Sequence, residues 1–348
     1  MHVLGQYLPN EEISSSISRI YRQEVSILNC DVEVKSNTPP KRLASIELTL
    51  STSATQKKLL AFFKETSENE LVCTSLANKV MPYSSPRILW HTEAEGRCWM
   101  LLENIANWVN IGTPPRVNEN MTEGLYEIHR VFLGQDDLLL QHFNTIPVAS
   151  KDRMKSFATN AREELNALSS HVVAKELFVD WEKIKERVDS VLSRVGDIVF
   201  PKTLLHGNYF PSSLRGIFDS EGRVRVIAYD WLYSCIGYPQ ADLALLLDRI
   251  DIMANDQGLE SPSPVLLQHY SDMLITEFSG VDFEQFLLTY EFCYICKILQ
   301  VLKWWIRAFV KHPTHDPARS ILEIKTKLRR LEIGPEGRDD TNRNSNES

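Results

Sequence analysis

The segment from Leu204 to Trp231, LLHGNYFPSSLRGIFDSEGRVRVIAYDW, constrains the fold more than any other part of the chain. It places a His-Gly turn, a short polar loop, a β-hairpin and an aspartate at a strand end in direct succession. Gly207 permits a positive φ angle, so the chain can reverse tightly there. His206 can hydrogen-bond backbone groups and brace the loop. We predict a hairpin over residues 214–229 that leads into Asp230.

The composition is that of an ordinary globular protein. With 348 residues, 43% apolar and 24% charged, the chain suits one large domain or two modest ones. A net charge of -8 disfavours attraction to nucleic acid or to an anionic membrane, so neither is an expected partner. No apolar run reaches the roughly 18 residues of a spanning helix. Residues 1–16 lack the basic flank and apolar stretch of a secretion signal, and we expect a cytoplasmic protein.

Cys293 and Cys296 form the only C-x-x-C pair among six scattered cysteines. A zinc site would need a second pair or nearby histidines, and a redox motif would need a βαβ context. The sequence offers neither, so we expect buried, reduced thiols on a helix.

The first hundred residues carry strand signals. Residues 45–50 alternate polar and apolar side chains, and residues 59–64 form a short apolar run. We expect strands over 42–50, 59–64, 87–90 and 98–102, and a helix over 68–80. Residues 1–103 therefore form a small antiparallel sheet with one helix.

After residue 103 the pattern becomes helical. Leu125, Ile128, His129 and Phe132 mark one helix face, on which His129 is expected to be a core residue. Further helices are expected over 184–195, from the spacing of its apolar residues, and over 283–310. We expect an α+β fold of two lobes, with a hinge near 103–107, a second lobe over 104–333, and a disordered tail over 334–348.

Aromatic side chains recur along 283–310. Two interpretations stay open for them: a wall that contacts an apolar or cationic ligand, or ordinary packing in the core. The residues concerned are Tyr290, Tyr294, Trp304, Trp305 and Phe309.

Asp230 is the first candidate for chemistry. A carboxylate at a strand end is a natural Mg²⁺ ligand, although aspartate is also common in turns and helix caps. Phosphoryl transfer needs a metal to neutralise phosphates, cationic contacts to place them, and a group that orients the acceptor hydroxyl. A tight loop beside a strand-end carboxylate supplies several of these parts.

The order of these features resembles the aminoglycoside phosphotransferase and choline kinase family, which is distantly related to protein kinases. That family has a loop of the form H-G-D-x-x-x-x-N, a hairpin and an I-D-W-like strand end. His206, Gly207, Asp230 and Trp231 match it, and residues 237–244, GYPQADLA, are similar to its G-x-P-x-x-D-L-A segment. The resemblance implies a bilobal protein-kinase-like fold, with an N-terminal nucleotide-binding lobe and a larger, mainly helical C-terminal catalytic lobe.

The resemblance also implies roles for residues upstream. Lys64, at the end of an apolar strand, would contact the nucleotide phosphates, with a solvated strand-end lysine as the structural alternative. Glu70 would pair with Lys64, and Glu68 is the alternative partner. Glu103 and Ile105 fall in the segment that resembles the hinge whose backbone groups bind adenine.

Two positions of the loop depart from the family pattern. Asn208 stands where the family has its catalytic Asp, and an amide cannot accept a proton. Ser213 stands where the family has a metal-binding Asn, or Ser212 does if the match slips by one residue. The turn at 36–40 contains no glycine, so it is a poor backbone cradle for phosphates. We therefore expect impaired or altered chemistry rather than complete inactivity.

Two functions follow as hypotheses. The first is an ATP- and Mg²⁺-dependent kinase that phosphorylates a hydroxyl of a small molecule or peptide. Asp230 and Ser213 would hold the metal, and Lys64 would hold the phosphates. Asn208 would orient the acceptor, and His206 would brace the loop that carries Asn208. The alternative is a pseudokinase that binds a peptide, a partner protein or a small molecule.

Overall fold

The computed structural model describes residues 8–36, 42–53, 55–82, 84–94, 96–104, 116–170, 178, 181–218, 224–311, 324–328 and 331. The chain separates into two compact units. The sheet unit comprises residues 1–131, 137–147 and 206–234, and the helical unit comprises 132–136, 148–205 and 235–348. The hinge predicted near 103–107 lies partly outside the described residues, and Ile105 and the predicted tail lie wholly outside them. The hinge, the role of Ile105 and the disorder of the tail therefore remain predictions.

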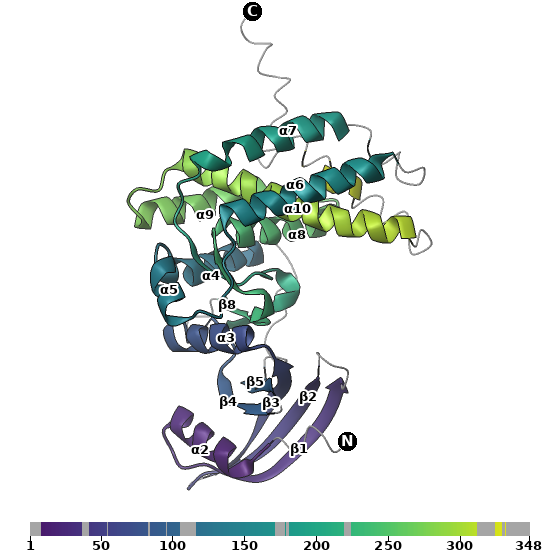
Figure 1. The fold of residues 1–348 in the computed structure, drawn as a ribbon. Coiled ribbons are helices and arrows are strands. Elements are labelled where there is room, and N and C mark those ends of the chain that lie inside the picture. Colours follow the sequence, from purple (N-terminus) through teal and green to yellow (C-terminus); the bar gives the residue numbers. More distant parts are fainter. Residues whose placement is uncertain are drawn as a thin grey trace, which may run out of the picture. The chain divides into compact units, whose positions relative to one another are not determined.

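The sheet unit is built on five antiparallel strands in the order β1-β2-β3-β5-β4 (Figure 1). The strands are β1 (Ser26–Ser36), β2 (Leu43–Ser51), β3 (Gln56–Thr66), β4 (Ile88–Ala94) and β5 (Arg97–Glu103). Burial alternates strictly along β2, because successive side chains point to opposite faces. The four predicted strands are confirmed, as is the predicted helix, α3 (Glu68–Val80).

One face of the sheet is covered by α2 (Asn10–Tyr21), a helix that the sequence interpretation missed. Its Ile13 and Ile17 are fully buried in one cluster with Ile46 and Phe63 of the sheet. Three consecutive serines, which are weak helix formers, hid the helix, although Ile13, Ile17 and Ile20 follow its period. The expectation of a single helix beside the sheet is therefore incomplete.

The predicted hairpin is confirmed as β7 (Leu214–Phe218) and β8 (Val224–Ala228). It packs on α4 (Arg116–Phe132), where a Cβ on Gly124 would lie 2.8 Å from Cβ of Val226. Tyr209, in the loop before the hairpin, is fully buried and donates to the carbonyl of Met121 at 2.9 Å. His129 of α4 is fully buried, as expected. Helix α5 (Asp136–His142) follows α4.

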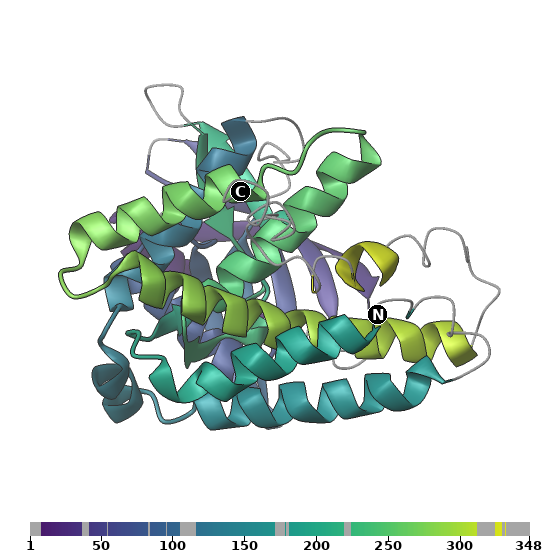
Figure 2. The same cartoon turned by 90° about the horizontal axis from the view of Figure 1, so that it is seen from above.

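The helical unit is arranged around α10 (Phe283–Lys311), which packs along α6 (Lys151–Ser169) and α8 (Gln240–Asp256) (Figure 2). The unit also contains α7 (Trp181–Ser193), α9 (Ser263–Glu277) and a pair of short strands, β6 (Thr203–Leu205) and β9 (Cys235–Gly237). The predicted helices at 184–195 and 283–310 are confirmed, with the last turn of the former continuing as a 3₁₀ turn over 194–197.

Side chains of α10 confirm part of the sequence interpretation. Cys293 and Cys296 are free, buried thiols on this helix. Tyr290 and Tyr294 are buried in the core, whereas Trp304 is 68% exposed, and the side chain of Phe309 lies outside the described part. Over the described residues, no helix has the length and apolar character needed to cross a membrane.

Candidate functional site

The loop from His206 to Ser213 reverses at Gly207, whose φ angle is 80°. A Cβ at this position would lie 2.0 Å from the carbonyl oxygen of Tyr233. Glycine is therefore required both by the backbone angle and by the close approach of the neighbouring chain.

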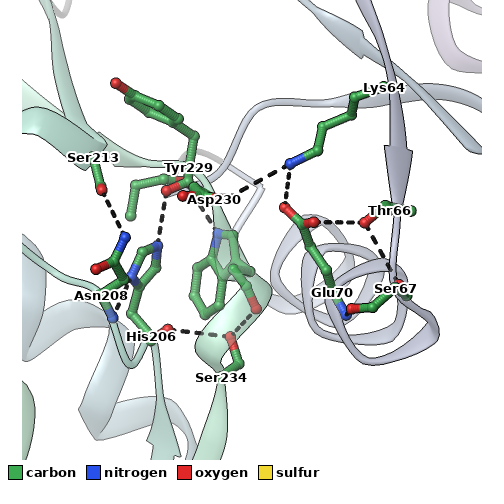
Figure 3. Close-up of polar contacts among 12 residues, drawn as sticks. Lys64, Thr66, Ser67, Glu70, His206, Asn208, Ser213, Tyr229, Asp230 and Ser234 are labelled. Carbon is green, nitrogen blue, oxygen red and sulfur yellow. Dashed lines mark hydrogen bonds and ion pairs between the residues drawn. The ribbon is translucent and has the colours of Figure 1, made fainter. Parts of the chain in front are cut away.

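His206 is fully buried and holds the loop to the end of β8. Its Nδ1 accepts the backbone N–H of Asn208 at 3.3 Å, and its Nε2 lies 3.1 Å from the carbonyl oxygen of Tyr229. Because a carbonyl only accepts, these partners assign the proton to Nε2 and make the ring neutral. Both ring nitrogens thus serve the backbone, and His206 is a positioning residue of the loop (Figure 3).

The two residues that depart from the family pattern contact each other. The Nδ2 group of Asn208 donates to Oγ of Ser213 at 3.3 Å. Ser213 is buried, whereas Ser212 is exposed, so Ser213 takes the position beside Asn208. Which of the two serines takes the family Asn position stays a prediction.

Asp230 follows β8 with a φ angle of 70°, in the left-handed region. Few residues other than glycine adopt this conformation, and such outliers gather at functional sites. The buried Trp231 fixes the turn, because its Nε1 donates to the carbonyl of Ala228 at 3.1 Å. The Asp230 side chain is 38% exposed, and its Oδ1 lies 3.7 Å from Nζ of Lys64.

Lys64 of β3 is held by Glu70 of α3. Its Nζ donates to Oε1 of Glu70 at 2.6 Å, and Thr66 donates to the other carboxylate oxygen at 2.6 Å. The Glu70 side chain is only 3% exposed, so it is a buried carboxylate with two strong donors. Glu68 is exposed, and the structure therefore selects Glu70 as the partner of Lys64.

The position of Glu70 depends on the start of α3. Ser67 caps the helix by accepting the backbone N–H of Glu70 at 3.1 Å. The sequence S67-E-N-E70 has the form of a capping box, but the Glu70 side chain turns to Lys64 and Thr66 instead. At the same helix, Asn69 donates to the carbonyl of Ser234 at 3.0 Å and so links α3 to the turn after Asp230.

The sequence interpretation missed Thr66, Ser67 and the residues around Tyr229. The S-x-x-E spacing at 67–70 was a usable signal for the cap, and the i, i+2 spacing places Thr66 on the face of Lys64. Tyr229 donates its hydroxyl to the carbonyl of Ser212. Burial raises the pKa of this tyrosine above its ordinary value, so the hydroxyl stays protonated as a donor.

The predicted hinge residue Glu103 is at the end of β5. Its backbone N–H donates to the carbonyl of Arg87 at 2.9 Å, and that of Asn104 donates to the carbonyl of Leu60 at 3.1 Å. These two donors are used within the sheet. The other hinge residue, Ile105, lies outside the described residues.

The donor set around Asp230 suits Mg²⁺ better than a transition metal. Among the described residues, no group of three or more His, Cys, Asp or Glu is placed to hold a metal. Mg²⁺ keeps several waters and takes one or two protein oxygens together with phosphate oxygens. The Asp230 carboxylate and the Ser213 hydroxyl fit that requirement in chemical type.

No protein-family model matches the chain, and no curated protein is similar to it. Solved structures are similar. An aminoglycoside phosphotransferase from Alicyclobacillus acidocaldarius is 10% identical, with a TM-score of 0.55 over 86% of this chain and 90% of that one. The chain has a protein-kinase-like fold. The ethanolamine kinase of Plasmodium vivax is 15% identical, with a TM-score of 0.51 over 86% of this chain and 81% of that one.

The GDP complex of an aminoglycoside 2'-phosphotransferase mutant has the same fold. It is 11% identical, with a TM-score of 0.54 over 94% of this chain and 99% of the other. These likenesses confirm the bilobal α+β fold that the sequence resemblance implied, that of the aminoglycoside phosphotransferase and choline kinase group.

Proposed function

We propose that this chain binds a nucleoside triphosphate with Mg²⁺, ATP being the expected nucleotide, and phosphorylates a hydroxyl of a small molecule or peptide. The row Glu70–Lys64–Asp230 carries this proposal. One ammonium lies 2.6 Å from a buried carboxylate and 3.7 Å from a partly exposed one. A lysine fixed in this way offers a positive charge to phosphate oxygens directly beside a potential metal ligand.

Each residue of the site has a separate role in this proposal. Lys64 contacts phosphate oxygens, and Glu70 and Thr66 keep its ammonium in place. Asp230 and Ser213 would hold Mg²⁺, which when bound neutralises charge on the phosphates. The amide of Asn208 orients the acceptor hydroxyl through its oxygen, since its nitrogen donates to Ser213.

The amide at Asn208 determines the rate of phosphate transfer that we expect. A positioned general base contributes about 10²–10⁴-fold to catalysis, and an amide cannot supply it. Orientation and charge neutralisation do most of the work in phosphoryl transfer, so slow turnover is still expected.

The bond between Asn208 and Ser213 favours a second function. Through this bond, the side chains of the two altered positions are hydrogen-bonded to each other. The loop from His206 to Ser213 contains no carboxylate. A pseudokinase built in this way would bind a peptide, a partner protein or a small molecule without transferring phosphate.

Nucleotide binding is tested by calorimetry with Mg²⁺-ATP on Glu70→Gln. Loss of the carboxylate frees Lys64, and we expect about tenfold weaker binding or more, the effect of one charge-assisted hydrogen bond. Glu68→Gln removes the same charge from an exposed position of α3 and should bind like the wild type. If wild type does not bind ATP, or if the two variants bind equally well, the assignment of this site fails.

Turnover separates the two functions. We expect Asn208→Asp to hydrolyse or transfer phosphate about 10²–10⁴-fold faster than wild type, because it restores a base. Slow transfer to a candidate acceptor by wild type supports the kinase. Binding of ATP without any transfer by wild type, together with activity in Asn208→Asp, supports the pseudokinase.

A further inference from the structure

Arg215 of β7 is a half-buried cation without a carboxylate partner among the described residues. Its Nη1 donates to the carbonyl of Leu214 at 2.6 Å, and its Cζ lies 5.1 Å from the centre of the Tyr229 ring. Buried arginines are normally paired, because withdrawing a charge from water is costly. The guanidinium also lies within hydrogen-bonding reach of the Tyr229 hydroxyl. Because a guanidinium has five N–H donors, several donors remain available beyond these contacts with described residues.

The hairpin directs Arg215 away from α4. Val226 faces α4, against Gly124, and is paired across the strands with Gly216. Because side chains alternate along a strand, Arg215 lies on the opposite face of β7. Ser213, the proposed metal ligand, ends the 3₁₀ turn that directly precedes β7, two residues before Arg215 along the chain.

Tyr229 holds the guanidinium in this place. Its backbone N–H donates to the carbonyl of Ser213 at 3.0 Å, and its own carbonyl contacts His206. Its hydroxyl donates to the carbonyl of Ser212. The ring beneath Arg215 is therefore fixed to the same loop that carries Asn208 and Ser213, and it directly precedes Asp230.

We propose that Arg215 binds an oxyanion, a phosphate or a carboxylate, of the ligand on this face of the hairpin. The inference rests on the proposed function, which makes Ser213 and Asp230 ligand-binding residues. It adds that the ligand carries a negatively charged group close to these two residues. A planar guanidinium matches the geometry of phosphate and carboxylate. The neutral Asn208 adds no negative charge that would compete for Arg215.

A second observation supports an additional phosphate contact. The sequence at 36–40, SNTPP, contains no glycine. Glycine is the residue that allows the closest approach of a backbone to a ligand. A chain without such a glycine relies more on cationic side chains to place a polyphosphate. The oxyanion belongs either to the nucleotide or to an acidic acceptor.

The test compares Arg215→Gln with Arg225→Gln, which removes the same charge from an exposed position of the same hairpin. Binding of Mg²⁺-ATP, pyrophosphate and adenosine is measured by calorimetry, and glycerol 3-phosphate is titrated in the presence of a non-hydrolysable ATP analogue. Thermal unfolding shows whether each variant folds. Arg215→Lys, which keeps the charge but loses the planar donors, should bind with intermediate affinity.

If the oxyanion belongs to the nucleotide, Arg215→Gln weakens ATP and pyrophosphate binding by about tenfold to a hundredfold and leaves adenosine unchanged. If it belongs to the acceptor, only glycerol 3-phosphate binding weakens. The inference is overturned if no phosphate compound binds more weakly to Arg215→Gln than to Arg225→Gln. Arg215-dependent binding of pyrophosphate by a protein that does not bind ATP would instead reject the proposed function alone.

Discussion

Two backbone positions with positive φ angles shape the candidate site. Gly207, at 80°, turns the loop, and Asp230, at 70°, turns the chain after β8. Between them, His206 bonds to the backbone on both sides and joins the two turns. The side chains of Asn208 and Asp230 therefore owe their placement to backbone geometry that few residue types can adopt.

Gly207→Ala tests this dependence. The new Cβ would meet the carbonyl oxygen of Tyr233 at 2.0 Å, so the backbone must shift. Gly96→Ala is the control, because Gly96 also has a positive φ angle, of 68°, but no atom within 4 Å of an added Cβ. In the control, the free energy of unfolding should fall by only about 1–2 kcal/mol, the cost of placing alanine in the left-handed region. Urea denaturation should show that Gly207→Ala lowers the free energy of unfolding by about 1–3 kcal/mol more than the control does. Equal decreases in the two variants would contradict the steric argument.

At the scale of elements, α3 connects helix capping to the candidate site. The same residue, Glu70, receives the cap from Ser67 through its backbone and holds Lys64 with its side chain. Fraying of the first turn of α3 would therefore release the lysine as well as lower stability.

Ser67→Ala and Ser150→Ala separate these two effects. Both serines cap a helix, and Ser150 does so for α6 by accepting the N–H of Arg153. Each substitution should lower the free energy of unfolding by about 1 kcal/mol. We expect only Ser67→Ala to weaken binding of Mg²⁺-ATP. If both variants bind as wild type does, α3 capping does not control Lys64.

The thiols of α10 give this element a dependence on pH. Burial raises the pKa of Cys296 to about 12 and that of Cys293 well above its ordinary value. Well below pH 9 the thiols are neutral in the folded and unfolded chain alike. Above it the unfolded chain ionises first, so stability falls as pH rises from about 9 towards 12.

Cys296→Ala should reduce this loss. The free energy of unfolding of wild type should fall more between pH 8 and pH 10 than that of the variant, by about 1–2 kcal/mol. Denaturant titrations at both pH values measure the difference. Parallel pH profiles for the two proteins would show that Cys296 does not remain neutral in the fold.

At the scale of the whole molecule, each compact unit joins segments that are far apart in the sequence. In the helical unit, the short helical segment Ile324–Leu328 is attached to α8 by an ion pair between Lys327 and Asp248 at 2.5 Å. Their side chains are 3% and 6% exposed, so the pair is almost fully withdrawn from water. Removal of one partner of a buried ion pair is strongly destabilising.

Asp248→Leu should therefore lower the free energy of unfolding by about 3–5 kcal/mol. Adding Lys327→Met should restore much of this loss, because the remaining charge is removed. Chemical denaturation of the single and double variants measures both effects. A single variant as stable as wild type would show that the C-terminal segment is not held by this pair.

The sequence by itself determined the elements whose signals are local. Alternating and apolar runs located β2 to β5, and the turn chemistry of Gly207 located the loop before the hairpin. The order of His206, Gly207, Asp230 and Trp231 along the chain resembles that of the aminoglycoside phosphotransferase and choline kinase family, and this resemblance implied the fold. These features depend on neighbours in sequence, and periodicity or backbone angle preference encodes them directly.

Only the tertiary structure decided which side chains meet. Glu70 rather than Glu68 reaches Lys64, and Ser213 rather than Ser212 contacts Asn208, because strand register and the helix cap set their directions. Arg215 became visible as a cation with no carboxylate partner among the described residues only once its surroundings were known. Contacts of this kind join residues from different elements, and the sequence carries no local signal for them. The segment that implied the fold therefore did not show how the side chains of the candidate site are arranged.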